Sequence, residues 1–240
     1  MERPVITRSC VKPMFETGYL SVYDLQYEEG RHYYDATRRS RDDICAVKTL
    51  EEFKAMTPDA VSCFVIIEQA QAEPLLLLNR EFRYPAGQVL LSVPAGLIDD
   101  RDRKDGNAEE ACLRAAAREI KEETGLVIGE KDTLCIVSPA VFSTPGMTDE
   151  SNALVLAVLR PEDKDFLKKN LTQSGAETTE KFDGFRLLDK KQAKELLVSG
   201  RDEDGIFFPV YSWMAMLYFV SGLWQEAAKA DKPEGKAEQV

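Results

Sequence analysis

The sequence predicts an α/β protein with an N-terminal β-hairpin module. Two continuous apolar runs, at 61–68 and 153–159, have the length and texture of buried strands. The run at 108–124 is rich in Ala, Glu, Leu, Arg and Lys, which are strong helix formers. The first 40 residues are polar but rich in aromatic side chains, and they indicate strands around a turn. With 240 residues and 44% hydrophobic content, the chain can bury one sizeable core and carry an extra module.

The N-terminal module is expected to cover residues 1–58. Residues 19–25 favour one strand and 32–37 a second, returning strand, with a turn at 28–30 between them. A short helix is expected at 50–56, before Pro58. The tyrosines of such a hairpin are more typical of a core or an interface than of a ligand site. The module is therefore a candidate for packing on its own domain or on a second chain.

The main domain is expected at 59–226, followed by a tail at 227–240 whose composition is typical of disorder. Its predicted strands are 61–68, 74–78, 89–93, 133–137, 153–159 and 184–188. Its predicted helices are 108–124, 190–199 and 209–226. For the first helix, Asn107 is the expected N-cap and Gly125 the expected stop. Its apolar stripe is expected to be Leu113, Ala116, Ala117 and Ile120.

Three acids of this helix raise a chemical question. Glu119, Glu122 and Glu123 are three or four residues apart, so all three can share one helix face. Like charges at this spacing destabilise a helix. Such a face either remains in water or holds a cation. The run REIKEE alone is more typical of a solvated face, so the choice between a solvated face and a cation site depends on the surrounding residues.

Bulk composition excludes several function classes. The net charge of −11 disfavours binding to nucleic-acid backbone or anionic membrane. An anionic substrate would then require metal ions or placed arginines. Five cysteines, odd in number and without close spacing, indicate reduced thiols and a cytoplasmic protein. The single histidine excludes a histidine-rich metal site or a serine–histidine mechanism. No signal peptide is expected at the N-terminus, and the longest apolar run, 207–220, is too short and interrupted to span a bilayer.

The run Arg118–Gly125 resembles the core of the Nudix box, the signature helix of the Nudix hydrolases. Glu110 stands eight residues before Arg118, as the family pattern requires, and Leu126 closes it. The first glycine departs from the pattern, whose spacing would place it at Lys104. Gly96 is the better match through the text PAGLID, which implies an eight-residue insertion at about 100–108.

The resemblance implies a fold and a metal site. The expected fold is an α/β/α sandwich with a mixed sheet. The expected cofactor is Mg²⁺ or Mn²⁺, for which carboxylate oxygens are suitable ligands. By resemblance, the backbone carbonyl of Ala95 holds the metal together with Glu119 and Glu123, assisted by Glu122. Arg118 beside these ligands can orient a glutamate.

Flanking sequence motifs narrow the resemblance to the ADP-ribose pyrophosphatase group. VPAGLID, REFRYP and the loop SxPGMTDE resemble that group, with Glu81 where glutamine is usual and Ser92 where glutamate is usual. The resemblance implies that Arg83 contacts the diphosphate and that Gly96 and Gly146 lie at the substrate. It also implies Glu150 as the catalytic base, with Asp149 as the alternative.

The expected function is metal-dependent hydrolysis of a nucleoside-diphosphate sugar, most simply ADP-ribose to AMP and ribose 5-phosphate, by a homodimer. One alternative is a UDP-sugar, GDP-sugar or dinucleotide on the same site. Another is a catalytically silent Nudix-fold sensor that binds its ligand without hydrolysis, which Ser92 and the insertion favour and the intact glutamates disfavour. A DNA-binding regulator is disfavoured, since no basic domain is attached.

Overall fold

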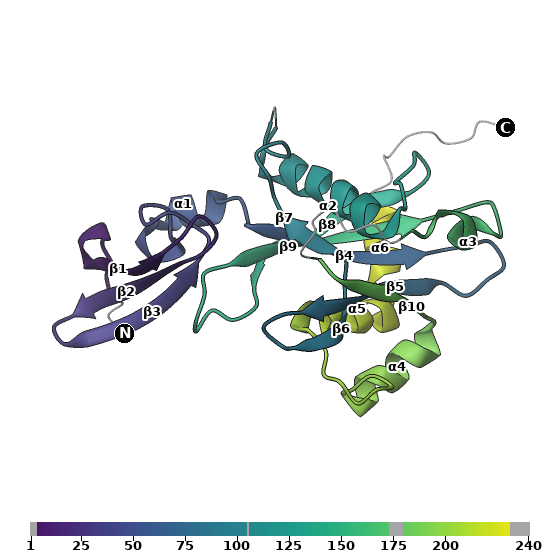
Figure 1. Ribbon diagram of the computed structural model, residues 1–240. Helices are drawn as coiled ribbons and strands as arrows, with labels where there is room; N and C mark the ends of the chain where they lie inside the picture. Colours follow the sequence, from purple (N-terminus) through teal and green to yellow (C-terminus); the bar gives the residue numbers. More distant parts are fainter. Residues whose placement is uncertain (1–3, 105, 173–179, 231–240) are drawn as a thin grey trace. The chain divides into compact units, whose positions relative to one another are not determined.

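The computed structural model describes residues 4–104, 106–172 and 180–230 (Figure 1). Contacts divide the chain into two compact units. The N-terminal unit comprises residues 1–60 and 140–152, and the main unit comprises residues 61–139 and 153–240. Segment 140–152, which lies inside the main domain predicted at 59–226, groups with the N-terminal strands.

A three-stranded antiparallel sheet forms the N-terminal unit, in the order β1 (Val11–Glu16), β2 (Ser21–Glu28) and β3 (Arg31–Thr37). The predicted hairpin corresponds to β2 and β3. Strand β1 was not predicted, because Pro13 interrupts it and all its residues after Val11 are exposed. A small core forms where β1 and β2 meet the segment before α1 (Leu50–Ala55), from Val11, Tyr23, Leu25 and Ile44.

The main sheet contains seven strands. They are β4 (Ala60–Ile67), β5 (Leu75–Arg83), β6 (Gln88–Ser92), β7 (Ala95–Leu97), β8 (Thr133–Phe142), β9 (Ser151–Leu159) and β10 (Phe182–Leu188). The order is β10-β5-β4-β9-β8, with β6 paired to β5 and β7 to β4. Strand β5 runs antiparallel to β4, β6 and β10. The Glu68 amide donates to the Leu159 carbonyl just where β4 and β9 end, so those two strands run parallel and the sheet is mixed, as predicted.

Helices cover both faces of this sheet (Figure 1). On one face, Val61, Cys63, Val65 and Ile67 of β4 form the main core together with the buried apolar residues of α2 (Ala108–Thr124). Because strand side chains alternate, Phe64 points the other way, and its ring lies 5.7 Å from that of Tyr218 in α5 (Val210–Ser221). Three layers result, which confirms the predicted α/β/α sandwich.

Helix α2 has the predicted limits. The Asn107 side chain accepts from the Glu110 amide at 3.0 Å, and Gly125 ends the helix at φ 75°. Of the predicted apolar stripe, Ala116 and Ile120 are buried, Leu113 is partly buried and packs against the main core, and Ala117 is only partly buried. The buried face consists of Ala111, Cys112, Ala115, Ala116, Glu119, Ile120, Glu123 and Thr124. Two of the three acids in question are therefore buried.

The C-terminal helices differ from the prediction in one respect. Helices α3 (Phe166–Asn170) and α4 (Lys190–Ser199) precede a pair, α5 and α6 (Leu223–Ala230), where a single helix was expected. Gly222 breaks that helix by adopting φ 83°. Helix α6 includes the first residues of the predicted tail, and 231–240 lie outside the described residues. In the described ranges, every helix is too short or too polar to cross a membrane.

Candidate functional site

Two buried carboxylates of α2 meet strand β7. Glu119 is 6% exposed and Glu123 4%. The Ala95 amide donates to Glu123 Oε1 at 3.2 Å. A Cβ at position 96 would lie 2.0 Å from Glu119 Oε1, so only glycine lets the Glu119 carboxylate approach the strand this closely. Glu119 and Glu123 therefore converge on the backbone of Ala95–Gly96.

Burial disfavours the ionised forms of Glu119 and Glu123 in this arrangement. Burial raises the pKa of Glu119 to about 7, against the opposing effect of Arg118. Burial also raises the pKa of Glu123 well above its ordinary value, despite the hydrogen bond from Ala95. Asn79 of β5 donates an amide hydrogen to Glu123, and its own Oδ1 is buried without a hydrogen-bond partner among the described residues. Two neighbouring buried acids of this kind are held either as neutral carboxyls or as carboxylates paired with a cation.

The guanidinium of Arg118 connects the acids of α2 to the loop before the helix. Its Nη1 donates to Glu119 Oε1 at 2.5 Å and to Glu122 Oε2 at 3.1 Å. Its Nη2 and Nε donate to the two carboxylate oxygens of Asp102, at 2.7 and 3.3 Å. Burial would raise the pKa of Asp102, but the Arg118 hydrogen bond keeps it below its ordinary value. Glu122 is less buried than Glu119 and also lies 3.6 Å from Arg101.

The donor atoms suit a hard divalent cation. No group of three or more His, Cys, Asp or Glu side chains in the described ranges is arranged to hold a metal ion. Glu119 and Glu123 beside Ala95 are a partial set of oxygen donors. Mg²⁺ typically binds through one or two carboxylates and keeps waters and substrate phosphates as further ligands. Because Gly96 has no side chain, the Glu119 carboxylate can lie close to the strand, and the oxygen donors of Glu119 and Glu123 are of the kind that such an ion binds.

Strand β5 carries the predicted phosphate-contacting arginine. Arg83 is half-exposed and pairs with Glu81 at 2.7 Å. Glu81 is buried, and burial raises its pKa. The register of β5 and β6 places Asn79 opposite Ser92. Sequence reasoning missed Asn79, although a polar residue that continues the run PLLLL is a signal for a buried hydrogen bond.

The loop between β8 and β9 belongs to the N-terminal unit. Glu150 Oε2 accepts from Arg38 Nε at 2.7 Å. The Gly146 carbonyl accepts from the Tyr33 hydroxyl at 3.1 Å. The structure therefore groups the predicted base and Gly146 with the N-terminal strands, while Glu119, Glu123 and Arg83 belong to the main unit.

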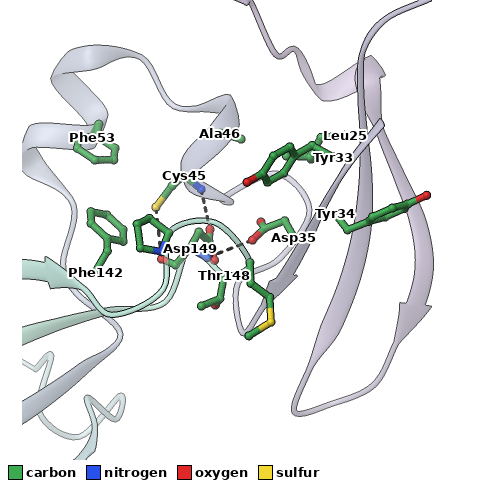
Figure 2. A pocket seen from close by; sticks show the side chains of 12 residues that line it. Leu25, Tyr33, Tyr34, Asp35, Cys45, Ala46, Phe53, Phe142, Thr148 and Asp149 are labelled. Atoms are coloured by element: carbon green, nitrogen blue, oxygen red, sulfur yellow. Dashed lines mark hydrogen bonds between the residues drawn. The ribbon is translucent and has the colours of Figure 1, made fainter. Parts of the chain in front are cut away.

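Asp149 anchors this loop inside the N-terminal unit, as Figure 2 shows. Its Oδ2 accepts from the Cys45 amide at 2.8 Å, and its own amide donates to Asp35 Oδ1 at 3.1 Å. Burial and the neighbouring Asp149 raise the pKa of Asp35 to about 6. The same residues border a cavity of about 320 Å³ whose aromatic walls include Phe53 and Phe142. Asp149 is thus a structural anchor of the loop.

Fold and site together define an α/β/α sandwich protein with an acidic helix set against a short strand. The family model of the NUDIX domain matches residues 56–210. The chain therefore belongs to the Nudix family, and the resemblance predicted from residues 93–126 is confirmed.

Three curated relatives show where the chain stands within that family. It is 31% identical to the ADP-sugar pyrophosphatase of Mus musculus over 131 residues, and this aligned region covers 55% of this chain and 54% of that protein. It is 33% identical over 124 residues to the ADP-ribose pyrophosphatase of Saccharomyces cerevisiae, covering 51% and 48%. A nudix hydrolase of Caenorhabditis elegans is 38% identical over 98 residues, covering 41% and 39%. The chain spans about half the length, or less, of these relatives. The predicted similarity to ADP-ribose pyrophosphatases is confirmed.

Proposed function

We propose that this protein hydrolyses the diphosphate of a nucleoside-diphosphate sugar, ADP-ribose first, to AMP and ribose 5-phosphate. The observation that carries the proposal is the convergence of buried Glu119 and Glu123 on Ala95–Gly96. The names of two relatives, an ADP-sugar pyrophosphatase and an ADP-ribose pyrophosphatase, support this substrate class.

The metal-binding part of the mechanism follows from α2 and β7. Bound Mg²⁺ or Mn²⁺ would neutralise diphosphate charge and polarise a water for attack on phosphorus. Glu119 and Glu123, with the Ala95 carbonyl, would hold the ion, and Glu122 would assist. Arg118 keeps Glu119 in place through its 2.5 Å hydrogen bond. Gly96 leaves room for the Glu119 carboxylate at the strand.

Substrate contacts and proton transfer are assigned to other segments. Arg83 steadies the diphosphate, which would replace Glu81 as its anionic partner. Gly146 offers backbone without a side chain at the substrate. Glu150 takes the proton from the attacking water. Asp149, the alternative base, is only 9% exposed and accepts from the Cys45 amide, whereas the Glu150 side chain is 33% exposed, so Glu150 is the stronger candidate.

The proposal is tested by incubating the protein with ADP-ribose and Mg²⁺ and measuring AMP. The wild type should release AMP, and Glu123→Gln should lose at least ~100-fold in turnover while it melts as a folded protein. Glu110→Gln is the matched control, because Glu110 is exposed and pairs only loosely with Arg114, at 3.6 Å. Equal turnover of wild type and Glu123→Gln would refute the metal site.

Two alternatives are separated by simple measurements. A UDP-sugar, GDP-sugar or dinucleotide pyrophosphatase would be recognised by its preference in a substrate panel. A silent Nudix-fold sensor is favoured by Ser92, which is buried where the group usually has a glutamate. Binding of ADP-ribose in calorimetry, without product after hours, would establish that sensor role.

We also propose that the protein is a homodimer of the cytoplasm. The N-terminal unit exposes large apolar side chains, including Phe15, Tyr19 and Tyr34, which favours an interface there. All five cysteines are free, which suits a reducing compartment. Sedimentation should give twice the mass of the chain, and a monomer would contradict the dimer.

A further inference from the structure

The loop between β7 and α2 supplies a buried acid that the family pattern does not contain. Asp102 is 4% exposed and lies within the predicted insertion. Both of its carboxylate oxygens accept from Arg118, and Oδ2 also accepts from the Asp99 amide at 3.0 Å. A carboxylate that binds two N–H groups of one guanidinium fixes its plane as well as its position.

The acid at the family's own position has a different partner. Glu110, eight residues before Arg118, lies exposed in the first turn of α2. Its carboxylate is 3.6 Å from Arg114, a weak surface pair. The carboxylate that contacts Arg118 is Asp102 of the loop, so the inserted residues at about 100–108 supply a direct partner of this arginine.

The consequence concerns the acids that face β7. Nε and Nη2 of Arg118 donate hydrogen bonds to Asp102 and the Leu97 carbonyl, so only Nη1 donates to Glu119 and Glu122. Without Asp102, the Arg118 guanidinium would have no carboxylate partner in the loop and could pair more fully with the Glu119 carboxylate. It would then compete with a divalent cation for the same carboxylate.

We infer that Asp102 is a positioning residue, which holds Arg118 so that Glu119 remains available to the metal ion. This inference rests on the proposed function, since it assigns the loop a part in the same metal site.

The test measures Mn²⁺ binding by calorimetry in the absence of substrate. Asp102→Asn keeps the size of the side chain and an oxygen for the Asp99 amide, and the Asp102 carbonyl still accepts from Arg114 at 2.8 Å. We expect it to weaken Mn²⁺ binding by about tenfold or more, as loss of a partner behind a metal ligand typically does. Glu110→Gln, the matched control, should bind within twofold of the wild type.

A double-mutant cycle separates positioning from loop structure. In an Arg118→Gln background, Asp102→Asn should cause no further loss of Mn²⁺ affinity, because the residue acts only through Arg118. An Asp102→Asn protein that binds Mn²⁺ like the wild type, or an equal loss in both backgrounds, would overturn the inference alone. A wild type that binds no Mn²⁺ would overturn the proposed metal site and this role with it.

Discussion

Gly96→Ala offers the sharpest test of the site geometry. The added Cβ would lie 2.0 Å from Glu119 Oε1 and 2.1 Å from its Cδ, whereas real Cβ contacts closer than 3.0 Å are essentially never observed. The Glu119 carboxylate would therefore have to retreat by about 1 Å or more. Gly96 is not among the glycines with positive φ, so alanine imposes no backbone strain. The whole effect falls on the carboxylate.

A displacement of about 1 Å in a catalytic arrangement can cost ~100-fold in rate. Gly96→Ala should therefore lower kcat/KM for ADP-ribose by ~100-fold, which corresponds to ~2.7 kcal/mol of transition-state stabilisation. The assay measures AMP release, and Mn²⁺ calorimetry should show weaker binding in parallel. Gly129→Ala is the matched control, because the nearest atom to its added Cβ is 3.4 Å away.

The reasoning would be refuted by a Gly96→Ala protein that hydrolyses ADP-ribose and binds Mn²⁺ like the Gly129→Ala control. Such a result would mean that the close approach of Glu119 to β7 is not needed for metal binding. Thermal melting of both variants guards against unfolding as the cause of a loss.

Two further predictions concern the N-terminal unit. The pKa of Asp35, about 6 in the folded protein against an ordinary 3.8, means that its ionisation opposes folding. The free energy of unfolding should therefore fall as the pH rises from about 4 to about 6. Asp35→Asn should raise the free energy of unfolding by up to ~3 kcal/mol at pH 7.5 but by almost nothing near pH 4. An equal rise in melting temperature at both pH values would contradict this. Glu150→Gln should lower kcat by ~10²–10⁴-fold, whereas Arg38→Ala, which removes only its half-exposed ion-pair partner, should change stability by less than ~1 kcal/mol. Unchanged kcat in Glu150→Gln would exclude it as the base.

The main elements were predictable because their signals are local. Helix α2 begins after Asn107 and ends at Gly125, and capping depends on residues within one turn. Strands β4 and β9 are continuous apolar runs, which indicate burial on both faces. Strand β1 escaped prediction because exposed residues and Pro13 gave it no pattern. The break at Gly222 escaped because apolar residues continue across it.

The sequence by itself determined the family, the acidic helix and the residues that share its face. Helical periodicity places Glu119 and Glu123 together, but it cannot tell whether water or protein covers them. That was decided by the packing of α2 against β7, which buries both carboxylates beside Gly96. Asn79, which donates to Glu123, lies 44 residues from it in the chain, and Asp102, which accepts from Arg118, lies 16 residues from that arginine. Only the tertiary structure brings such distant side chains within hydrogen-bond distance, because no local pattern encodes a contact between separate elements.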